Sequence, residues 1–249
     1  MLSDEERQRY SRQIMLGGFG EEGQEKLKRA RVVVAGAGGL GTPAATYLAA
    51  AGIGTLRVID NDRVDLSNLN RQILHWSKDV GRNKTDSAGE KLRELNDRIS
   101  VEPVLETICD TNVSQLVKGF DVIVDGTDNL ETRFMLNRAA LEEGIAFVHG
   151  AVYGFEGRVT TIVPGKSPCL GCIYRGAIPR QKSPVVGATP GVVGALQASE
   201  TIKYIVGLGD LLTGKLLVYD GMRMRFTVLA IRKDPNCRYC SRPGQPKSP

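Results

Sequence analysis

The stretch that most constrains the fold lies between residues 31 and 60 and reads RVVVAGAGGLGTPAATYLAAAGIGTLRVID. The β-branched run at 32–35 predicts a buried strand, and an alanine-rich helix should follow over about 42–51. A second apolar strand is expected at 56–59. Strand, helix and strand in this order predict a βαβ unit with a parallel sheet.

The residues between these elements indicate nucleotide binding. Gly36, Gly38 and Gly41 fit the pattern G-x-G-x-x-G, with Gly39 inside it, at the junction of the first strand and the helix. Such glycines let the backbone turn tightly and approach a phosphate at the helix N-terminus, although they also serve close helix–sheet packing. Asp60 ends the second strand, where an acid can accept hydrogen bonds from ribose hydroxyls. The combination predicts a nucleotide site.

Composition narrows the class of protein. The chain has 249 residues and a net charge of +5, with basic residues interleaved with acids rather than gathered in a tract that would bind nucleic acid. The N-terminus is charged and no apolar run is long enough to span a bilayer, so we expect no signal peptide, no membrane contact and a cytoplasmic location. In a reducing compartment, the five cysteines should be metal ligands or free thiols.

The N-terminal segment, residues 3–30, is expected to be helical. Ser3 followed by Glu6 fits a capping box, and the amphipathic segment that follows should extend to about residue 15 before glycines interrupt it. A second helix is expected at 21–29. Taken alone, Arg7, Arg9 and Arg12 are explained as a solvated helix face.

A long polar connection follows Asp60 and contains Asn68, Arg71, Gln72 and Lys84. Ligands of parallel sheets bind at the carboxyl ends of the strands, so this position favours ligand contact. Asn and Asp also form structural turns, so position alone leaves both readings open. A helix is expected over about 84–97.

A further strand is expected at 120–124, after one at 101–105, and it ends in Asp125-Gly-Thr-Asp128-Asn129. A helix should begin at about residue 130. Asp128 could be the N-cap of that helix, or an acid that holds a metal or lies at a phosphate site beside the glycine turn.

The character of the chain changes after residue 145. Short strands at 145–149, 157–163, 216–219 and 226–231 suggest an antiparallel extension of the sheet, with a helix over about 192–206. His149 is expected to be a strand residue rather than a catalyst, and His75 has no obvious nucleophile as a partner. The fold class is therefore α/β: a Rossmann-like parallel sheet with helices on both faces, extended by antiparallel C-terminal strands.

Four cysteines form two C-x-x-C pairs, Cys169 with Cys172 and Cys237 with Cys240. Together they can complete a tetrahedral four-thiolate zinc site, which would be structural because no coordination position remains open. A redox dithiol is the alternative. Cys109 stands alone and is expected to be an inert, partly buried thiol.

The ordered motifs GAGGLG, VIDND, DLSNLNRQ, NKTDSA and DGTDN, followed by two C-x-x-C pairs, closely resemble the adenylyltransferases of the MoeB and ThiF type. These enzymes activate ubiquitin-like sulfur-carrier proteins. The match begins at RYSRQI and covers essentially the whole chain. It implies a single domain over 1–249, with N-terminal helices at 1–30, a nucleotide-binding half at 31–144 and a carrier-binding half at 145–249.

The resemblance also implies the chemistry. A homodimer would bind Mg-ATP, and the C-terminal glycine carboxylate of a ubiquitin-fold carrier ending in Gly-Gly would attack the α-phosphate to give an acyl-adenylate and pyrophosphate. Gly36, Gly38, Gly39 and Gly41 would approach the phosphates and Asp60 would hold the ribose. Carried over by position, the residues that contact the triphosphate or complete the site are Asn68, Arg71, Gln72, Lys84 and Asn129. Asp128 would hold magnesium, and Arg12 would reach into the neighbouring subunit's site; Arg12, Arg71, Lys84 and Asp128 form the catalytic set.

One departure concerns the loop after the first cysteine pair. Several relatives carry a cysteine there that forms a thioester or persulfide, whereas residues 180–190 (RQKSPVVGATP) contain none, and Arg180 lies near the expected position. We therefore expect adenylation without a covalent intermediate in this loop. Without room for an appended rhodanese domain, sulfur would come from a separate sulfurtransferase or cysteine desulfurase.

Two further functions fit parts of the pattern. A tRNA-modifying relative would activate a carboxylate on a nucleoside, although the absence of a concentrated basic face argues against it. A non-catalytic subunit that only docks a ubiquitin-like protein could lose its phosphate-contact residues, which this chain keeps. An NAD-dependent oxidoreductase fits least, because the DLSNLNRQ and DGTDN blocks are foreign to it.

Overall fold

The computed structural model describes residues 1–174 and 184–241, which form an eight-stranded sheet in the order β3-β2-β1-β4-β5-β6-β7-β8. The strands are β1 (Arg31–Ala35), β2 (Thr55–Asp60), β3 (Ser100–Leu105), β4 (Val122–Asp125), β5 (Ala146–Tyr153), β6 (Glu156–Ile162), β7 (Lys215–Asp220) and β8 (Arg225–Ala230). Strands β1 to β5 pair in parallel, and β5 to β8 pair antiparallel. The mixed α/β sheet expected from the sequence is confirmed.

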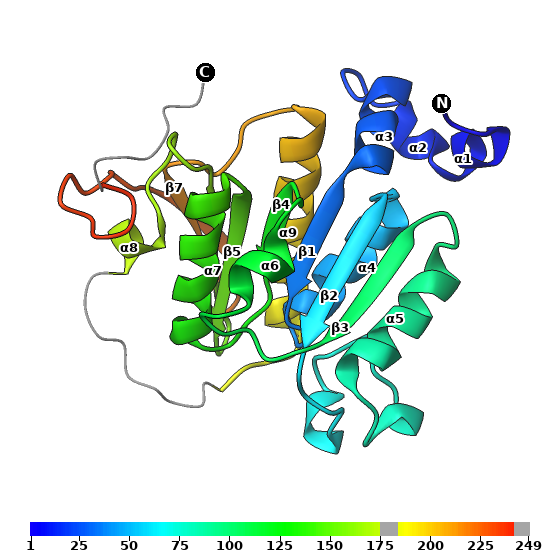
Figure 1. Ribbon diagram of the computed structural model, residues 1–249, viewed down its shortest axis with the longest axis horizontal. Coiled ribbons are helices and arrows are strands. Elements are labelled where there is room, and N and C mark those ends of the chain that lie inside the picture. The colour runs from blue at the N-terminus through cyan, green and yellow to red at the C-terminus, as the bar shows by residue number, and fades with distance from the viewer. Residues whose placement is uncertain (175–183, 242–249) are drawn as a thin grey trace.

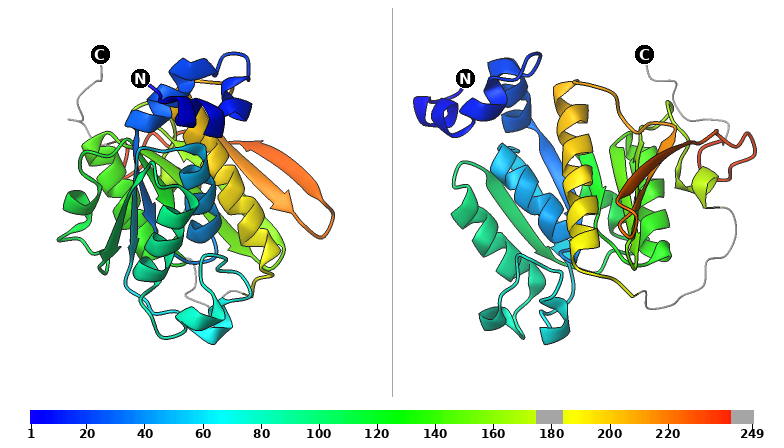
Figure 2. Two further views of the ribbon diagram at one scale, coloured as in Figure 1. Left: turned by 90° about the vertical axis from the view of Figure 1, so that its right-hand side faces the viewer. Right: turned by 180° about the vertical axis from the view of Figure 1, so that it is seen from behind.

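Helices cover both faces of the parallel half (Figures 1 and 2). Helices α4 (Gly41–Ala51), α5 (Lys84–Leu95) and α9 (Ala188–Val206) pack on one face, and α6 (Val113–Val117) and α7 (Leu130–Glu143) on the other. Strand β1 explains why both faces need cover. Its side chains alternate, so that Val32 and Val34 enter one core while Val33 and Ala35 enter the other, and all four are fully buried.

The N-terminal helices α1 (Asp4–Arg9), α2 (Ser11–Ile14) and α3 (Gly20–Arg29) lie beyond the amino end of β1 (Figure 1). The Ser3–Glu6 capping box is confirmed. The first helix does not run on to residue 15, because Tyr10 leaves the helical conformation. Its side chain is buried, and its hydroxyl accepts a hydrogen bond from Asn96 Nδ2 (2.8 Å).

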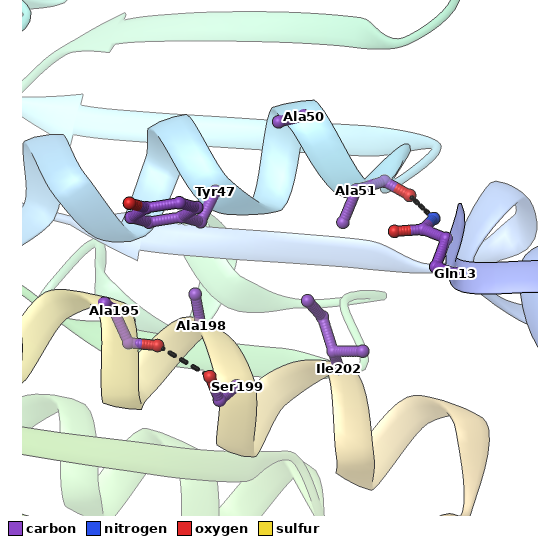
Figure 3. Close-up of a pocket in the computed structure, with 8 residues that line it drawn as sticks. All are labelled: Gln13, Tyr47, Ala50, Ala51, Ala195, Ala198, Ser199 and Ile202. Atoms are coloured by element: carbon purple, nitrogen blue, oxygen red, sulfur yellow. Dashed lines mark hydrogen bonds between the residues drawn. The ribbon is translucent and has the colours of Figure 1, made fainter. Parts of the chain in front are cut away.

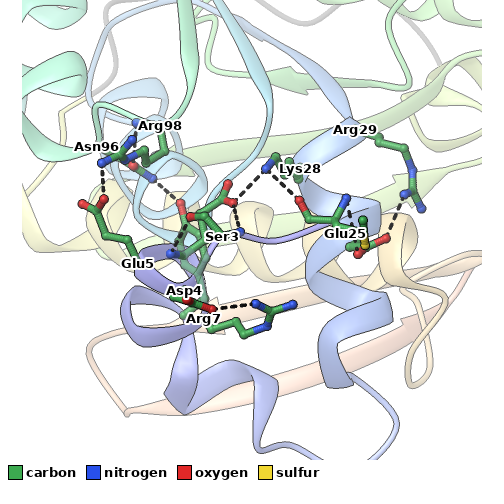
Figure 4. Close-up of polar contacts among 12 residues, drawn as sticks. Ser3, Asp4, Glu5, Arg7, Glu25, Lys28, Arg29, Asn96 and Arg98 are labelled. Atoms are coloured by element: carbon green, nitrogen blue, oxygen red, sulfur yellow. Dashed lines mark hydrogen bonds and ion pairs between the residues drawn. The ribbon is translucent and has the colours of Figure 1, made fainter.

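Ion pairs fix these helices on the body of the protein (Figure 4). Glu5 of α1 pairs with Arg98, and buried Glu6 accepts from Lys28 Nζ of α3 at 2.8 Å. The hydrogen bond from Lys28 and that from the Ser3 N–H lower the pKa of Glu6. These contacts join α1 to α3 and to the segment before β3.

Some expected boundaries were wrong. Helix α9 begins at Ala188, a full turn before residue 192, because Pro190 lies in its first turn, where a missing N–H leaves no intrahelical bond unmade. Helix α6 and the single turn α8 (Leu170–Ile173) were not expected at all, since they are too short to show a period. Within the two described ranges, none of the helices combines the length and the apolar character that crossing a bilayer requires.

Candidate functional site

The glycine turn at the carboxyl end of β1 is closed by backbone-to-backbone packing. Gly36 has φ +101°, and a Cβ on Gly41 would lie 1.7 Å from the Gly36 carbonyl oxygen, so only glycine fits at Gly41. Within the described chain, the N–H groups of Gly38, Gly39 and Leu40 donate to no protein acceptor. Because they precede the N-terminus of α4, the turn presents donors suited to an anion.

Asp60 fixes this turn from the neighbouring strand. Its Oδ2 accepts from the Ala37 N–H at 2.7 Å, while Oδ1 accepts from the Asp62 N–H at 2.8 Å. The carboxylate is half-buried at the edge of the sheet where β1 and β2 end. The structure thus brings Asp60 to the glycine turn, as the sequence predicted.

The connection after β2 folds back onto the turn. A Cβ on Gly39 would lie 3.4 Å from Arg71 Cγ, and one on Gly38 would lie 3.8 Å from Gln72 Nε2. Arg71 Nη1 donates to Ser67 O (2.8 Å), which holds its guanidinium along the loop. Gln72 is 4 % exposed, and its Oε1 finds no hydrogen-bond partner in the described structure.

Asn68 and Lys84 complete this side of the site. Asn68 Oδ1 accepts from the Asp65 N–H (3.2 Å) and so shapes the short turn that precedes Arg71. Lys84 is the first residue of α5; its side chain is buried, and its Nζ pairs with Asp62 Oδ2 at 2.7 Å. Asp62 was not predicted as a site residue, although its position two residues after Asp60, just past the end of β2, could have indicated it.

The end of β4 contacts the glycine turn directly. A Cβ on Gly36 would lie 2.7 Å from the Gly126 carbonyl oxygen, so the two loops pack backbone against backbone. Asp128, two residues further on, is exposed, and among the residues described here its carboxylate makes no hydrogen bond or ion pair. The N-cap alternative for Asp128 was wrong: Asn129 is the cap, its Oδ1 accepting from the Thr132 N–H at 2.9 Å.

A buried polar network supports the Asp128 loop from below. Asp125 is fully buried and contacts His149 Nδ1 (2.6 Å), Arg133 Nε (3.3 Å) and Thr127 Oγ1 (2.7 Å). Burial opposes ionisation of Asp125, but Arg133 and His149 outweigh it and lower its pKa. His149 is a strand residue, as expected, and its Nε2 lies 3.0 Å from the Tyr174 hydroxyl.

One protonation pattern satisfies this network. Burial lowers the pKa of His149 despite the neighbouring carboxylate. The neutral ring then donates from Nδ1 to Asp125 and accepts at Nε2 from Tyr174. The network holds the loop between Asp125 and Asn129. It was not predicted, because His149 and Tyr174 lie 24 and 49 residues along the chain from Asp125.

Arg12 is not brought to this site within the chain. It is exposed on α2, where the adjacent Gln13 donates to Ala51 O at the C-terminal end of α4. The glycine turn is at the other end of this 11-residue helix, about 16 Å away. Figure 1 shows α2 at the opposite end of the sheet from the loop that follows β2.

A groove lies between α4 and α9, and Gln13, the residue after Arg12, is part of its lining (Figure 3). It has a volume of about 320 Å³ and is lined by Gln13, Tyr47, Ala50, Ala51, Ala195, Ala198, Ser199 and Ile202. Tyr47 is 56 % exposed; Met15 and Leu16, which directly follow α2, are 74 % and 57 % exposed.

The two cysteine pairs meet in one cluster. The Sγ atoms of Cys169, Cys172, Cys237 and Cys240 all lie within 4.8 Å of one another, and all four side chains are buried. A tetrahedral zinc with Zn–S bonds near 2.3 Å would place the sulfurs roughly 3.8 Å apart. The contacts of 3.5 Å (Cys169–Cys237) and 3.6 Å (Cys172–Cys240) fit this geometry, and all four thiols are free of disulfides.

Other sequence expectations concern isolated residues. Cys109 is partly buried, as expected, and hydrogen bonding to Thr111 lowers its pKa; that this thiol is inert stays a prediction. Arg7 and Arg9 lie on the surface with partners of their own, Glu21 and Leu95 O. Arg180 lies outside the described residues.

Comparisons with known proteins agree with this arrangement. The model of the ThiF family matches residues 10–239. The SAMP-activating enzyme E1 of Haloferax volcanii is 46 % identical over 242 residues, covering 95 % of this chain and 89 % of the relative. The sulfur carrier protein adenylyltransferase of Thermus thermophilus is 41 % identical over 247 residues, covering 95 % and 91 %.

A solved structure supports the same assignment. The crystal structure of E. coli MccB with ATP superimposes with a TM-score of 0.85 and 27 % sequence identity, over 93 % of this chain and 73 % of that one. The glycine turn, the segment that carries Asn68 and Arg71, and Cys169, Cys172 and Cys237 lie within the part of the chain that matches the family model, and Cys240 is one residue beyond it. The chain belongs to the ThiF family.

Proposed function

We propose that this protein uses ATP to adenylate the C-terminal glycine of a small ubiquitin-fold sulfur carrier, for molybdopterin or thiamine sulfur transfer. The observation that carries the proposal is the meeting of four segments at one edge of the sheet: the glycine turn, the loop with Asn68 and Arg71, the start of α5 with Lys84, and the loop with Asp128. The names of the relatives from Haloferax volcanii and Thermus thermophilus point to the same activity.

In this proposal the donors of the site hold the triphosphate. The N–H groups from Gly38 to Leu40 and the cations of Arg71 and Lys84 bind phosphate oxygens, and Asp60 accepts from the ribose hydroxyls. Asp128 is an exposed carboxylate beside these groups, which suits a magnesium ligand. Bound magnesium would offset charge on the phosphate oxygens.

The reaction needs no side-chain nucleophile. A carboxylate oxygen of the carrier's terminal glycine attacks the α-phosphorus, the bond to the bridging oxygen breaks, and pyrophosphate leaves. Two anions must approach each other, so fixed positive charge and orientation supply the catalysis. Asp62 holds the Lys84 ammonium at the edge of the site.

We further propose that the protein acts as a homodimer in which Arg12 enters the partner's site. The groove between α4 and α9 is lined in part by Gln13 of α2, the helix that carries Arg12, and a second copy seated there would cover the exposed side chain of Tyr47. The four-cysteine cluster would hold structural zinc, tying the C-terminal segment to α8. A sulfurtransferase or cysteine desulfurase would then supply sulfur to the activated carrier, and a cytoplasmic location remains a prediction.

ATP–pyrophosphate exchange tests the proposal. Exchange should require a carrier with an intact Gly-Gly tail and should fall about 10²-fold or more in Asp128→Asn. Glu143→Gln, an exposed carboxylate at the other end of α7, is the matched control and should exchange normally. Exchange that depends on tRNA instead of a carrier, or ATP binding without exchange, would contradict the proposal in favour of a tRNA-modifying enzyme or a docking subunit.

A further inference from the structure

His75 is buried between the glycine turn and helix α5. The side chain is 3 % exposed, its Nε2 lies 2.9 Å from the Ala37 carbonyl oxygen, and its Nδ1 lies 3.0 Å from Ser87 Oγ. Ala37 belongs to the turn, and Ser87 is one helical turn after Lys84 on α5. One side chain therefore bridges the two elements that supply the proposed phosphate contacts.

The partners of His75 define its protonation. A carbonyl oxygen only accepts, so Nε2 must carry the proton that it donates to Ala37. Burial lowers the pKa of His75, and the nearby Lys84 and Lys91 act in the same direction, against the Ala37 carbonyl and Asp60. The ring is thus neutral, and Nδ1 accepts from the Ser87 hydroxyl.

A buried ion pair holds Ser87 in place. Lys91 Nζ donates to Ser87 Oγ at 2.9 Å and to Asp79 Oδ2 at 2.6 Å, and both Lys91 and Asp79 are buried. The contacts thus run from Ala37 through His75, Ser87 and Lys91 to Asp79, which lies in the loop before α5. Such a chain gives the imidazole one orientation rather than several.

Both backbone polar groups of Ala37 are consequently fixed from outside the turn. Its N–H donates to Asp60, and its carbonyl accepts from His75. The N–H groups that follow, from Gly38 to Leu40, have no protein acceptor among the described residues. The orientation of these donors depends on how Ala37 is held.

We propose that His75 is a positioning residue that sets the glycine turn at a fixed distance from Lys84, so that both can engage one triphosphate. The proposal rests on the proposed function, because it concerns the same ATP site. His75 touches no substrate in this account and acts through Ala37 and Ser87. Phosphate binding, and not nucleoside binding, is the property it controls.

Calorimetric titration with ATP and with adenosine tests this inference. In His75→Leu, affinity for ATP should fall about five- to tenfold, the effect of one lost hydrogen bond, while affinity for adenosine should not change. His75→Gln places an amide N–H near the position of Nε2 and should restore most of the ATP affinity. The same samples, followed by thermal unfolding, show whether the variants fold.

Three results would overturn the inference: unchanged ATP affinity in His75→Leu, equal loss of ATP and adenosine binding, or no recovery in His75→Gln. If His75→Leu does not fold, Ser87→Ala provides the test, because it removes the hydroxyl that donates to His75 Nδ1. This variant should lower the affinity for ATP but not the affinity for adenosine. A wild-type protein that binds no ATP would instead contradict the proposed function, so the two failures are distinguishable.

Discussion

At the scale of single residues, a buried ion pair makes the stability of the protein depend on pH. Asp79 and Lys91 form an ion pair with side chains 0 % and 4 % exposed, and Arg82 contacts the second Asp79 oxygen at 2.8 Å. Burial alone would raise the pKa of Asp79, but the hydrogen bonds from Lys91 and from the Trp76 N–H outweigh it and lower that pKa to about 2. Removing one partner leaves an uncompensated buried charge.

We therefore expect Asp79→Asn to cost about 3–5 kcal/mol of unfolding free energy at neutral pH. Because the pKa of Asp79 is lower in the folded than in the unfolded chain, where it is about 3.9, the folded state binds fewer protons between these values. The advantage of the wild type should thus shrink as pH falls from about 4 to about 2. Urea unfolding across this range measures the difference.

The exposed acid Glu94 on α5, the helix that carries Lys91, provides the control. Glu94→Gln should follow the wild type at every pH. A difference between wild type and Asp79→Asn that stays constant down to pH 2 would contradict the role given to the ion pair.

Residue positions were predictable where the motif fixes them along the chain. Asp60, Arg71 and Gln72 follow a strand end by short, defined intervals, and each lies at the glycine turn. The partnership of His75 with Ala37 spans 38 residues, and that of His149 with Asp125 spans 24. Contacts of this kind depend on how helices pack on the sheet, which no local pattern encodes.

At the scale of elements, two glycines of the turn between β1 and α4 have different roles, one in folding and one in ligand binding. A Cβ on Gly41 would collide with the Gly36 carbonyl at 1.7 Å, whereas one on Gly39 would meet Arg71 and Pro190 side chains at an ordinary 3.4 Å. The junction of β1 and α4 therefore requires glycine at position 41. Position 39 requires glycine only if a ligand must approach the backbone there.

Gly41→Ala should accordingly destabilise the protein by about 3 kcal/mol or more. Gly39→Ala should leave the melting temperature nearly unchanged but lower the affinity for ATP about tenfold, because its methyl group would lie where a phosphate oxygen accepts a hydrogen bond. Thermal unfolding and ATP titration on both variants check this. A Gly39→Ala protein with normal ATP affinity would show that phosphate does not bind at this turn.

The cysteine cluster is an element that joins distant parts of the chain, since Cys169 and Cys237 are 68 residues apart. We expect zinc at one ion per chain by elemental analysis, and loss of that zinc in Cys240→Ser with a fall in melting temperature of about 5 °C or more. Cys109→Ser should keep the zinc, because Cys109 lies outside the cluster. Retention of full zinc by Cys240→Ser would refute the ligand set.

Elements were predictable from the sequence in proportion to their length and burial. The β-branched strand β1 and the alanine-rich helix α4 were identified within a residue or two. The predicted start of helix α9, residue 192, lies too far along the chain. Proline usually breaks a helix, but Pro190 is tolerated because it lies in the first turn. The break at Tyr10 depends on a tertiary hydrogen bond to Asn96, which the local sequence cannot show.

At the scale of the whole molecule, Arg12 and the glycine turn lie at opposite ends of α4. If Arg12 serves catalysis, it must do so in a second subunit. Mixing two inactive variants, Arg12→Ala and Asp128→Asn, should then restore activity, because each mixed dimer has one intact site. Random reassociation predicts a recovery of about a quarter of the wild-type exchange rate.

Recovery requires the dimer, so the groove provides a control. Adding Tyr47→Glu to both variants should abolish the recovery and give monomers in sedimentation experiments, since it places a charge on the apolar surface between α4 and α9. Mixed variants that stay inactive while remaining dimeric would contradict the role of Arg12 in the partner's site.

Transfer of the α-phosphoryl group to the carrier tests the central claim most directly. The protein is incubated with a Gly-Gly carrier and ATP radiolabelled at either the α- or the γ-phosphorus, and label on the carrier is measured. The account predicts label from α-labelled ATP only, lost when the terminal glycine is removed. Label from γ-labelled ATP, or no label on any carrier while ATP is bound, would contradict it.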